Sequence, residues 1–293
     1  SAQTATMPAD HLNRIPLDDA VERLAQNTHA DAAFREKLDD VIRRLATNKQ
    51  TDAAWRLYCK LKESGFAFTS REYTLFVSAV GSAARRGLAA RAEQVERDLN
   101  AAGLCDPLDA AQAGALMRAS ANAGHFDRAM RVYERTRSAF AEGGRELPQS
   151  LVLSFLSACS RAGEVELSQR VYDEHRRGLV VAGVLYRAHT LLLNAYARRG
   201  RLEDVVRLHV QGLATDEGLR PSKETLNAHL LACRVRGDAD AAVRIYRDRG
   251  RVRPDNVTLK LLLDTCLEAE RPRIAFELCF EAEARGLVEF DVL

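Results

Sequence analysis

Glycine recurs along this chain with a period that few folds accommodate. Five glycines follow one another at intervals of 37, 39, 37 and 37 residues, namely Gly87, Gly124, Gly163, Gly200 and Gly237. A fixed period of about 20 to 50 residues is typical of arrays in which small supersecondary units stack on one another. The length of 293 residues would allow two ordinary domains, but the period predicts one array.

A second signature keeps the same register. It consists of a small residue or valine, an arginine two places later, then an aliphatic residue and an aromatic residue or histidine, with copies over residues 54–58, 129–133, 168–172, 205–209 and 242–246. Apolar residues have helical spacing before the glycine, as Leu192 and Tyr196 do, and after it, as Val205 and Leu208 do. Glycine favours the left-handed conformation that ends helices. Each unit is therefore predicted to be two amphipathic helices joined at a glycine.

One such hairpin cannot bury its apolar face alone, whereas a stack of hairpins shares a continuous core. We therefore predict an all-α fold, an α-solenoid of about seven helix-turn-helix repeats. The units are expected to start near residues 35, 70, 110, 149, 186, 223 and 256, and to fill residues 35–290. Residues 1–34 are expected to form an N-terminal extension with one capping helix, from Leu17 to about Gln26.

The residues that open the last units resemble one repeat family. The seventh unit begins with Pro-Asp-Asn-Val-Thr-Leu-Lys (254–260), and the sixth with Pro-Ser-Lys-Glu-Thr-Leu-Asn (221–227) followed by Ala-Cys-Arg-Val-Arg-Gly (232–237). These segments are similar to the pentatricopeptide repeat (PPR), whereas the marker residues of tetratricopeptide and ankyrin repeats are missing. The resemblance covers about residues 35–290, is strongest in the last three units, and implies a right-handed α-solenoid of PPR-like repeats.

Proteins of this family are typically single-stranded RNA binders, and the resemblance implies one base per unit, read mainly by the fifth and the last residue of the unit. Asn227 with Asp255 resembles the family's uracil-preferring pair, and Thr74 with Asp109 resembles its guanine-preferring pair. Thr190, Ser222 and Lys260 also stand at fifth or last places of their units, so the resemblance makes them base-reading candidates too.

Two neighbouring units interrupt this reading. Their fifth and last places hold Gly114 with Pro148 and Leu153 with Leu185, side chains with almost no hydrogen-bonding capacity. The formal net charge of +2 is also low for a protein that binds many phosphates. Both features weigh against continuous reading of bases.

Candidate phosphate contacts lie at the ends of the first helices of two units: Arg198, Arg199, Arg234 and Arg236. The competing interpretation is that these arginines are solvated and complement the negative end of the helix dipole. The arginines of the second signature lie on the second helices, where salt bridges on the outer face are expected instead of RNA contacts.

Motifs of catalysis and metal binding are missing from the sequence. It has no P-loop, GxGxxG, HExxH or GxSxG motif and no cysteine and histidine cluster with zinc spacing. Cys159, Cys233 and Cys266 occupy the same place in their units, so packing is expected of them. We expect no enzyme, no cofactor, no metal, no small-molecule substrate and no membrane span.

Two functions remain open. The favoured one is an RNA-associated PPR scaffold, a subunit of an organellar ribonucleoprotein complex such as an organellar ribosome or an RNA-processing assembly. Its expected partners are single-stranded or ribosomal RNA and protein subunits of that complex. The alternative is a sequence-specific single-stranded RNA-binding adaptor for organellar transcript processing, editing, stabilisation or translation. The resemblance implies a mitochondrial location, with the chloroplast as the alternative.

Overall fold

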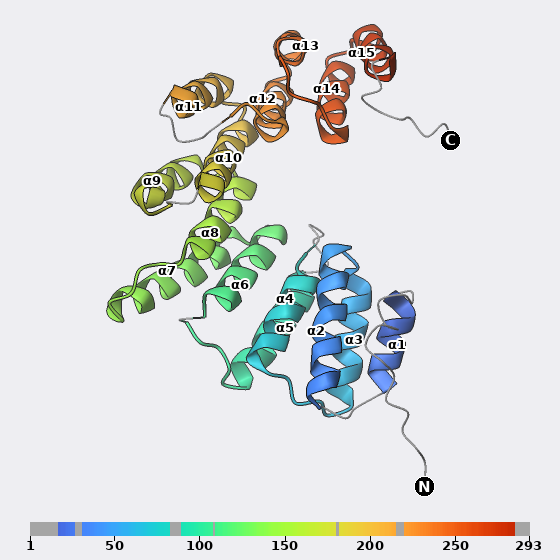
Figure 1. Cartoon of the computed structure of the whole chain (residues 1–293), viewed down its shortest axis with the longest axis vertical. Helices are drawn as coiled ribbons and strands as arrows, with labels where there is room; N and C mark the ends of the chain where they lie inside the picture. Colours follow the sequence, from blue (N-terminus) through green and yellow to red (C-terminus); the bar gives the residue numbers. More distant parts are fainter. Residues whose placement is uncertain are drawn as a thin grey trace. The chain divides into compact units, whose positions relative to one another are not determined.

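The computed structural model describes residues 17–26, 31–82, 89–107, 109–179, 182–214 and 220–284. Within these ranges the regular structure consists of fifteen α-helices and a single 3-10 turn, and it contains no strand (Figure 1). The predicted all-α solenoid of about seven hairpins is therefore confirmed.

After an initial helix, α1 (Leu17–Gln26), the remaining α-helices form seven consecutive hairpins. In chain order the pairs are α2 (Ala32–Thr47) with α3 (Thr51–Glu63), α4 (Ser70–Val80) with α5 (Ala89–Ala101), α6 (Ala110–Asn122) with α7 (Phe126–Glu142), α8 (Gln149–Ala162) with α9 (Val165–His175), α10 (Ala182–Arg198) with α11 (Leu202–Ala214), α12 (Lys223–Arg236) with α13 (Ala239–Arg247), and α14 (Asn256–Glu268) with α15 (Pro272–Ala284). The 3-10 turn, η3 (Arg176–Gly178), follows α9.

The chain forms two compact units, Ser1–Ala158 and Cys159–Leu293, and the division falls inside α8. In the first unit, the first helices α2, α4 and α6 pack side by side in that order, and in the second unit α10, α12 and α14 do the same. Second helices such as α5 and α13 pack against the first helix of their own hairpin and that of the next. Each unit therefore has a layer of first helices and a layer of second helices.

The periodic glycines have the backbone conformation that the period predicts. Gly124, Gly163, Gly200 and Gly237 all have φ between 67° and 83°, whereas Gly87 lies outside the described residues. At the end of α12, the amide of Gly237 donates to Arg234 O at 3.0 Å and the amide of Asp238 donates to Cys233 O at 2.9 Å. This left-handed ending satisfies two carbonyls that the helix leaves unpaired.

Residues of the second signature and the aligned cysteines form the core. The signature tyrosines Tyr58, Tyr133 and Tyr246 are at most 2% exposed. Cys159, Cys233 and Cys266 are fully buried, as expected of packing positions. Burial raises the pKa of the Cys159 thiol to about 12 and that of Cys233 to about 11, so both thiols are inert at neutral pH.

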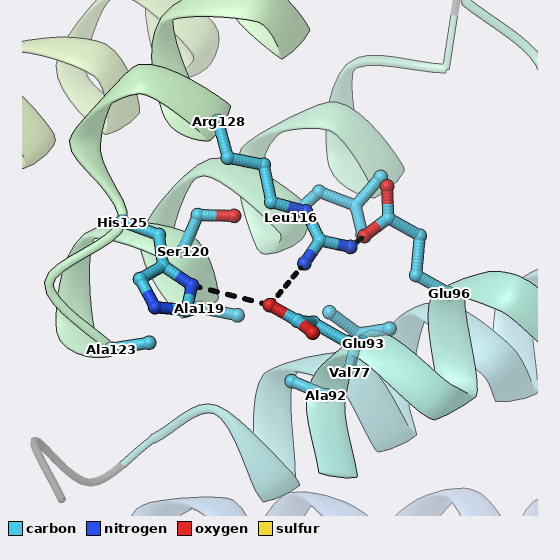
Figure 2. A pocket seen from close by; sticks show the side chains of 10 residues that line it. All are labelled: Val77, Ala92, Glu93, Glu96, Leu116, Ala119, Ser120, Ala123, His125 and Arg128. Atoms are coloured by element: carbon cyan, nitrogen blue, oxygen red, sulfur yellow. Dashed lines mark hydrogen bonds and ion pairs between the residues drawn. The ribbon is translucent and has the colours of Figure 1, made fainter. Parts of the chain in front are cut away.

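Ion pairs join equivalent parts of consecutive hairpins. Figure 2 shows one such junction, where Arg128 of α7 reaches over α5 and binds both Glu93 and Glu96. The Arg128 Nη1 to Glu93 Oε1 distance is 2.7 Å, and His125 Nδ1 lies 3.2 Å from the same oxygen. Arg91 binds Asp52 of the preceding hairpin at 2.5 Å in the same way. Arginine therefore links neighbours about one period apart.

Candidate nucleic-acid interface

The candidate base-reading residues at the fifth place lie on the first helices. Thr74 is on α4, Thr190 on α10, Asn227 on α12 and Lys260 on α14. Because α10, α12 and α14 pack side by side in the second compact unit, Thr190, Asn227 and Lys260 form a row along that layer, whereas Thr74 lies on the layer of first helices of the first unit. Lys260 is exposed, Thr74 and Asn227 are half-buried, and Thr190 is only 9% exposed.

Three of the candidate last-place residues are N-caps of the next first helix. Asp109 accepts from the amides of Ala111 and Gln112 at 2.9 and 3.1 Å. Ser222 and Asp255 each accept from the amide three residues later, at 3.3 and 2.9 Å. Each side chain therefore satisfies a backbone donor that the helix start leaves unpaired. Leu185, in contrast, lies inside α10.

The structure brings Asn227 and Asp255 into direct contact. Asn227 Nδ2 donates to Asp255 Oδ1 at 3.3 Å, and Thr258 Oγ1 lies 2.6 Å from Asn227 Oδ1. Burial acts to raise the pKa of the Asp255 carboxyl, but hydrogen bonds from Thr258 and Asn227 and the charge of Lys223 outweigh it and lower that pKa. Asp255 is therefore an anion at neutral pH, and its hydrogen bond fixes the orientation of the Asn227 amide.

Thr74 and Asp109 are arranged differently. Thr74 Oγ1 donates to Ser70 O within its own helix at 2.8 Å, and the part of the chain that the structure describes has no hydrogen bond between Thr74 and Asp109. Instead, Gln112 Nε2 donates across from α6 to Ser70 Oγ at 3.1 Å. The two candidate readers lie on adjacent, packed helices without being locked together.

Tyr186 lies between the third pair of candidates, Thr190 and Ser222. Thr190 Oγ1 donates to Tyr186 O at 3.0 Å, and the Tyr186 hydroxyl forms a short hydrogen bond with Ser222 Oγ. The same hydroxyl donates to Glu224 Oε2 at 3.2 Å. The Thr190 hydroxyl thus donates its proton inside the protein, and the Ser222 hydroxyl already has two partners there, Tyr186 and the Thr225 amide.

Three of the four candidate phosphate contacts hold groups of neighbouring hairpins. Arg199 Nε donates to Gly163 O at 2.7 Å. Arg234 pairs with Asp264 and Glu268 of the following hairpin, at 3.0 and 2.6 Å. Arg236 pairs with Glu203 of the preceding hairpin. Carboxylates neutralise Arg234 and Arg236, and Arg199 Nη2 lies 3.8 Å from Glu164 Oε1. These arginines are therefore not simply solvated at the ends of their helices.

The fourth candidate, Arg198, has a cation beside it. Burial and the like charge of Arg161 lower the pKa of the Arg198 guanidinium. Arg161 and Arg198 lie at the last turns of α8 and α10, where both residues keep part of their surface in solvent although the Arg198 guanidinium is partly enclosed by the protein. Two arginines that repel each other are stabilised by a shared anion, so Arg161 joins Arg198 as a candidate contact. The repeat pattern in the sequence does not identify Arg161 as a contact.

The described residues provide no metal site and no helix for a membrane. No group of three or more histidine, cysteine, aspartate or glutamate side chains among them could hold a metal ion. None of the described helices is both long and apolar enough to cross a bilayer.

Known proteins share both the repeat and the fold. The family model described as "PPR repeat" matches residues 187–211. A mitochondrial pentatricopeptide repeat-containing protein of Arabidopsis thaliana is 26% identical over 141 residues, which are 48% of this chain and 21% of that protein.

Among solved structures, the maize pentatricopeptide repeat protein PPR10 has the same fold. Its complex with an 18-nt psaJ RNA element aligns with a TM-score of 0.58 at 17% identity, over 94% of this chain and 40% of that one. A second crystal structure of maize PPR10 aligns with a TM-score of 0.50 at 15% identity, over 91% of this chain and 40% of that one. The chain therefore spans about two fifths of PPR10 and about a fifth of the Arabidopsis relative.

Proposed function

Because the chain is a pentatricopeptide repeat protein, we propose that it is a non-catalytic, RNA-associated scaffold that forms a subunit of an organellar ribonucleoprotein complex. The complex is an organellar ribosome or an RNA-processing assembly, in the mitochondrion or, alternatively, in the chloroplast. The scaffold docks RNA and protein subunits without reading a continuous series of bases.

The observation that carries this proposal is the pairing of the candidate phosphate contacts. Arg199, Arg234 and Arg236 bind carbonyl or carboxylate groups of adjacent hairpins, so their charge holds the solenoid together and adds little to a phosphate track. Affinity for single-stranded RNA depends on the number of phosphates that cations neutralise. A solenoid in which these three arginines bind groups of the protein itself, and whose net charge is +2, is suited to a place in a complex, where RNA is held by many subunits.

The test has two parts. Sedimentation of lysed organelles should place the protein in a large particle that becomes smaller when RNA is digested. Binding of the isolated protein to random single-stranded RNA, followed by fluorescence anisotropy, should be weak, with a shallow salt dependence and with selectivity confined to isolated nucleotides. A protein found only as a free monomer in the lysate would contradict the scaffold.

The alternative, a sequence-specific RNA-binding adaptor, is favoured by one observation, the hydrogen bond between Asn227 and Asp255. An amide held by a carboxylate presents a fixed donor and acceptor to a base edge. PPR10, whose structure with an 18-nt RNA element shares this fold, is the precedent for such binding.

Selection from a random RNA library distinguishes the two functions. The adaptor predicts a motif in which the guanine set by Thr74 and the uracil set by Asn227 are separated by the bases of three hairpins. Enrichment of that motif would overturn the scaffold. Failure to bind RNA at moderate salt, together with binding to a protein subunit, would overturn the adaptor.

A further inference from the structure

In the third hairpin, the side chain of Arg118 fills the place beside the fifth residue, which is a glycine. Gly114 has no side chain, but Arg118, one turn later on α6, lies over it. A Cβ built on Gly114 would lie 3.1 Å from Arg118 Nη1 and 3.0 Å from Ser154 Oγ. The guanidinium therefore occupies the space into which a fifth-place side chain would project.

Ser154 on α8 holds this guanidinium in place. Arg118 Nη1 donates to Ser154 Oγ at 2.8 Å, and Ser154 Oγ donates to Ser150 O at 2.8 Å. Because the serine hydroxyl uses its proton on its own helix, its lone pair is directed to the arginine. Ser154 is only 7% exposed, whereas Arg118 is exposed. One end of the guanidinium is thus fixed to the protein on the row of first helices.

We propose that Arg118 is the RNA contact of the third hairpin and that it binds the edge of an unpaired guanine. This inference rests on the proposed function, because it assumes that RNA lies along the first helices. Gly114 and Pro148, the fifth and last residues of this hairpin, provide no side-chain hydrogen-bond donor. The gap that these residues leave in the sequence is therefore closed by a residue from another place of the same unit.

The chemistry of the guanidinium selects the base. It presents parallel N–H groups in a planar fork, and guanine offers two adjacent acceptors, O6 and N7, at the matching spacing. Adenine replaces one of these acceptors with an amino group, so only one hydrogen bond remains. Unpaired bases in RNA loops expose this edge to proteins, which suits a scaffold that docks folded RNA.

The experiment removes one acceptor from the RNA and the donor from the protein. Libraries of RNA are first selected on the wild-type chain and on Arg118→Ala, and the guanine that only the wild type enriches is identified. That guanine is then replaced by 7-deazaguanine, which lacks N7, and binding is measured by anisotropy. We expect the wild type to lose about tenfold in affinity, and Arg118→Ala to bind both RNAs equally.

Two further variants separate recognition from charge and from folding. Arg118→Lys keeps the charge but lacks the fork, so it should lose the preference for guanine over 7-deazaguanine and keep most of the affinity for RNA in general. Arg131→Ala removes an exposed arginine from α7 of the same hairpin and should bind like the wild type. Thermal unfolding by circular dichroism checks that all variants are folded.

The remaining outcomes overturn the inference. If Arg118→Ala weakens binding to every RNA equally and lowers the salt dependence, the arginine contacts a phosphate. If Arg118→Ala or Arg118→Lys discriminates as the wild type does, the arginine only ties α6 to α8. If the isolated wild type binds no RNA, or binds it without a guanine preference, this inference is overturned, whereas the scaffold itself fails only if the protein sediments as a free monomer in the organelle lysate.

Discussion

Individual polar residues in this chain have structural partners that the sequence does not show. The repeat pattern placed Asp109, Ser222 and Asp255 at the last position of their units, and the structure shows each as an N-cap. A pattern compares equivalent positions in successive units, so it selects Gly114 and passes over Arg118, which enters the same space from one turn away. The sequence could therefore predict where three of the first helices begin, but not that Arg118 fills the space beside Gly114.

Burial also sets the behaviour of single histidines. His189 on α10 is 4% exposed, its Nδ1 lies 3.4 Å from the Tyr172 hydroxyl, and within the described residues its Nε2 has no hydrogen-bond partner. Burial lowers the pKa of His189 to about 4. Burial and the neighbouring His229 and His189 lower the pKa of His209 to about 4 as well. These imidazoles are neutral in the folded protein.

The first prediction concerns His189 and pH. A histidine whose folded pKa is lowered binds its proton more readily in the unfolded chain, so its contribution to stability is full above the unfolded pKa of about 6.5 and is lost as pH falls from there toward 4. The loss is about 1 kcal/mol per pH unit for one such group. Urea unfolding at several pH values should show a shallower pH dependence for His189→Phe than for the wild type. An identical dependence in both would contradict the burial argument.

At the scale of helices, the pattern was more informative. The glycine period and the arginine and aromatic signature predicted seven hairpins because both depend on local physics, namely the left-handed end of a helix and the apolar face of the next one. Helix α8 and its neighbours follow the period although their fifth and last places depart from the family pattern. What the pattern did not predict is the ion pairing between hairpins, since it depends on side chains that meet only in three dimensions.

The second prediction compares two glycines at helix ends. A Cβ on Gly81 would lie 2.4 Å from Ala119 Cβ on the next first helix, whereas a Cβ on Gly237 would meet nothing within 4 Å. Gly81→Ala should therefore force α4 and α6 apart and cost about 1 to 3 kcal/mol. Gly237 has φ of 72°, so Gly237→Ala should cost about 1 kcal/mol through its backbone alone.

Guanidinium denaturation of both variants measures these costs. Under the packing argument, the small-to-large change at Gly81 can be partly rescued by Ala119→Gly, which removes the opposing methyl group, whereas Ala119→Gly should not rescue Gly237→Ala. Equal costs, or no rescue at Gly81, would contradict the close approach of α4 and α6.

At the scale of the whole molecule, the hairpins divide into two compact units. In repeat proteins each hairpin contacts mainly its neighbours, so stability is the sum of local contributions and parts of the array can unfold separately. The buried histidines His189 and His229 and the half-buried His209 all belong to the second unit, whereas Trp55, the single tryptophan of the chain, belongs to the first.

The third prediction follows from that distribution. Fluorescence of Trp55 reports the unfolding of the first unit, and far-UV circular dichroism reports both, so their urea transitions should not coincide. The second unit contributes to the dichroism transition but not to the fluorescence transition. Lowering the pH from 7 to 5 should shift the unfolding of this unit to lower urea concentration and change the Trp55 transition less. Superimposable transitions at both pH values would show that the units unfold as one.

Capping limits how the last positions of these units can evolve. Because Asp109, Ser222 and Asp255 each begin a helix, a substitution there that suits a new nucleotide must also be able to accept a hydrogen bond from the backbone. Aspartate, asparagine, serine and threonine meet that requirement, and most other side chains do not. Helix formation therefore restricts which side chains are available at these places for the proposed RNA contacts, before any RNA is bound.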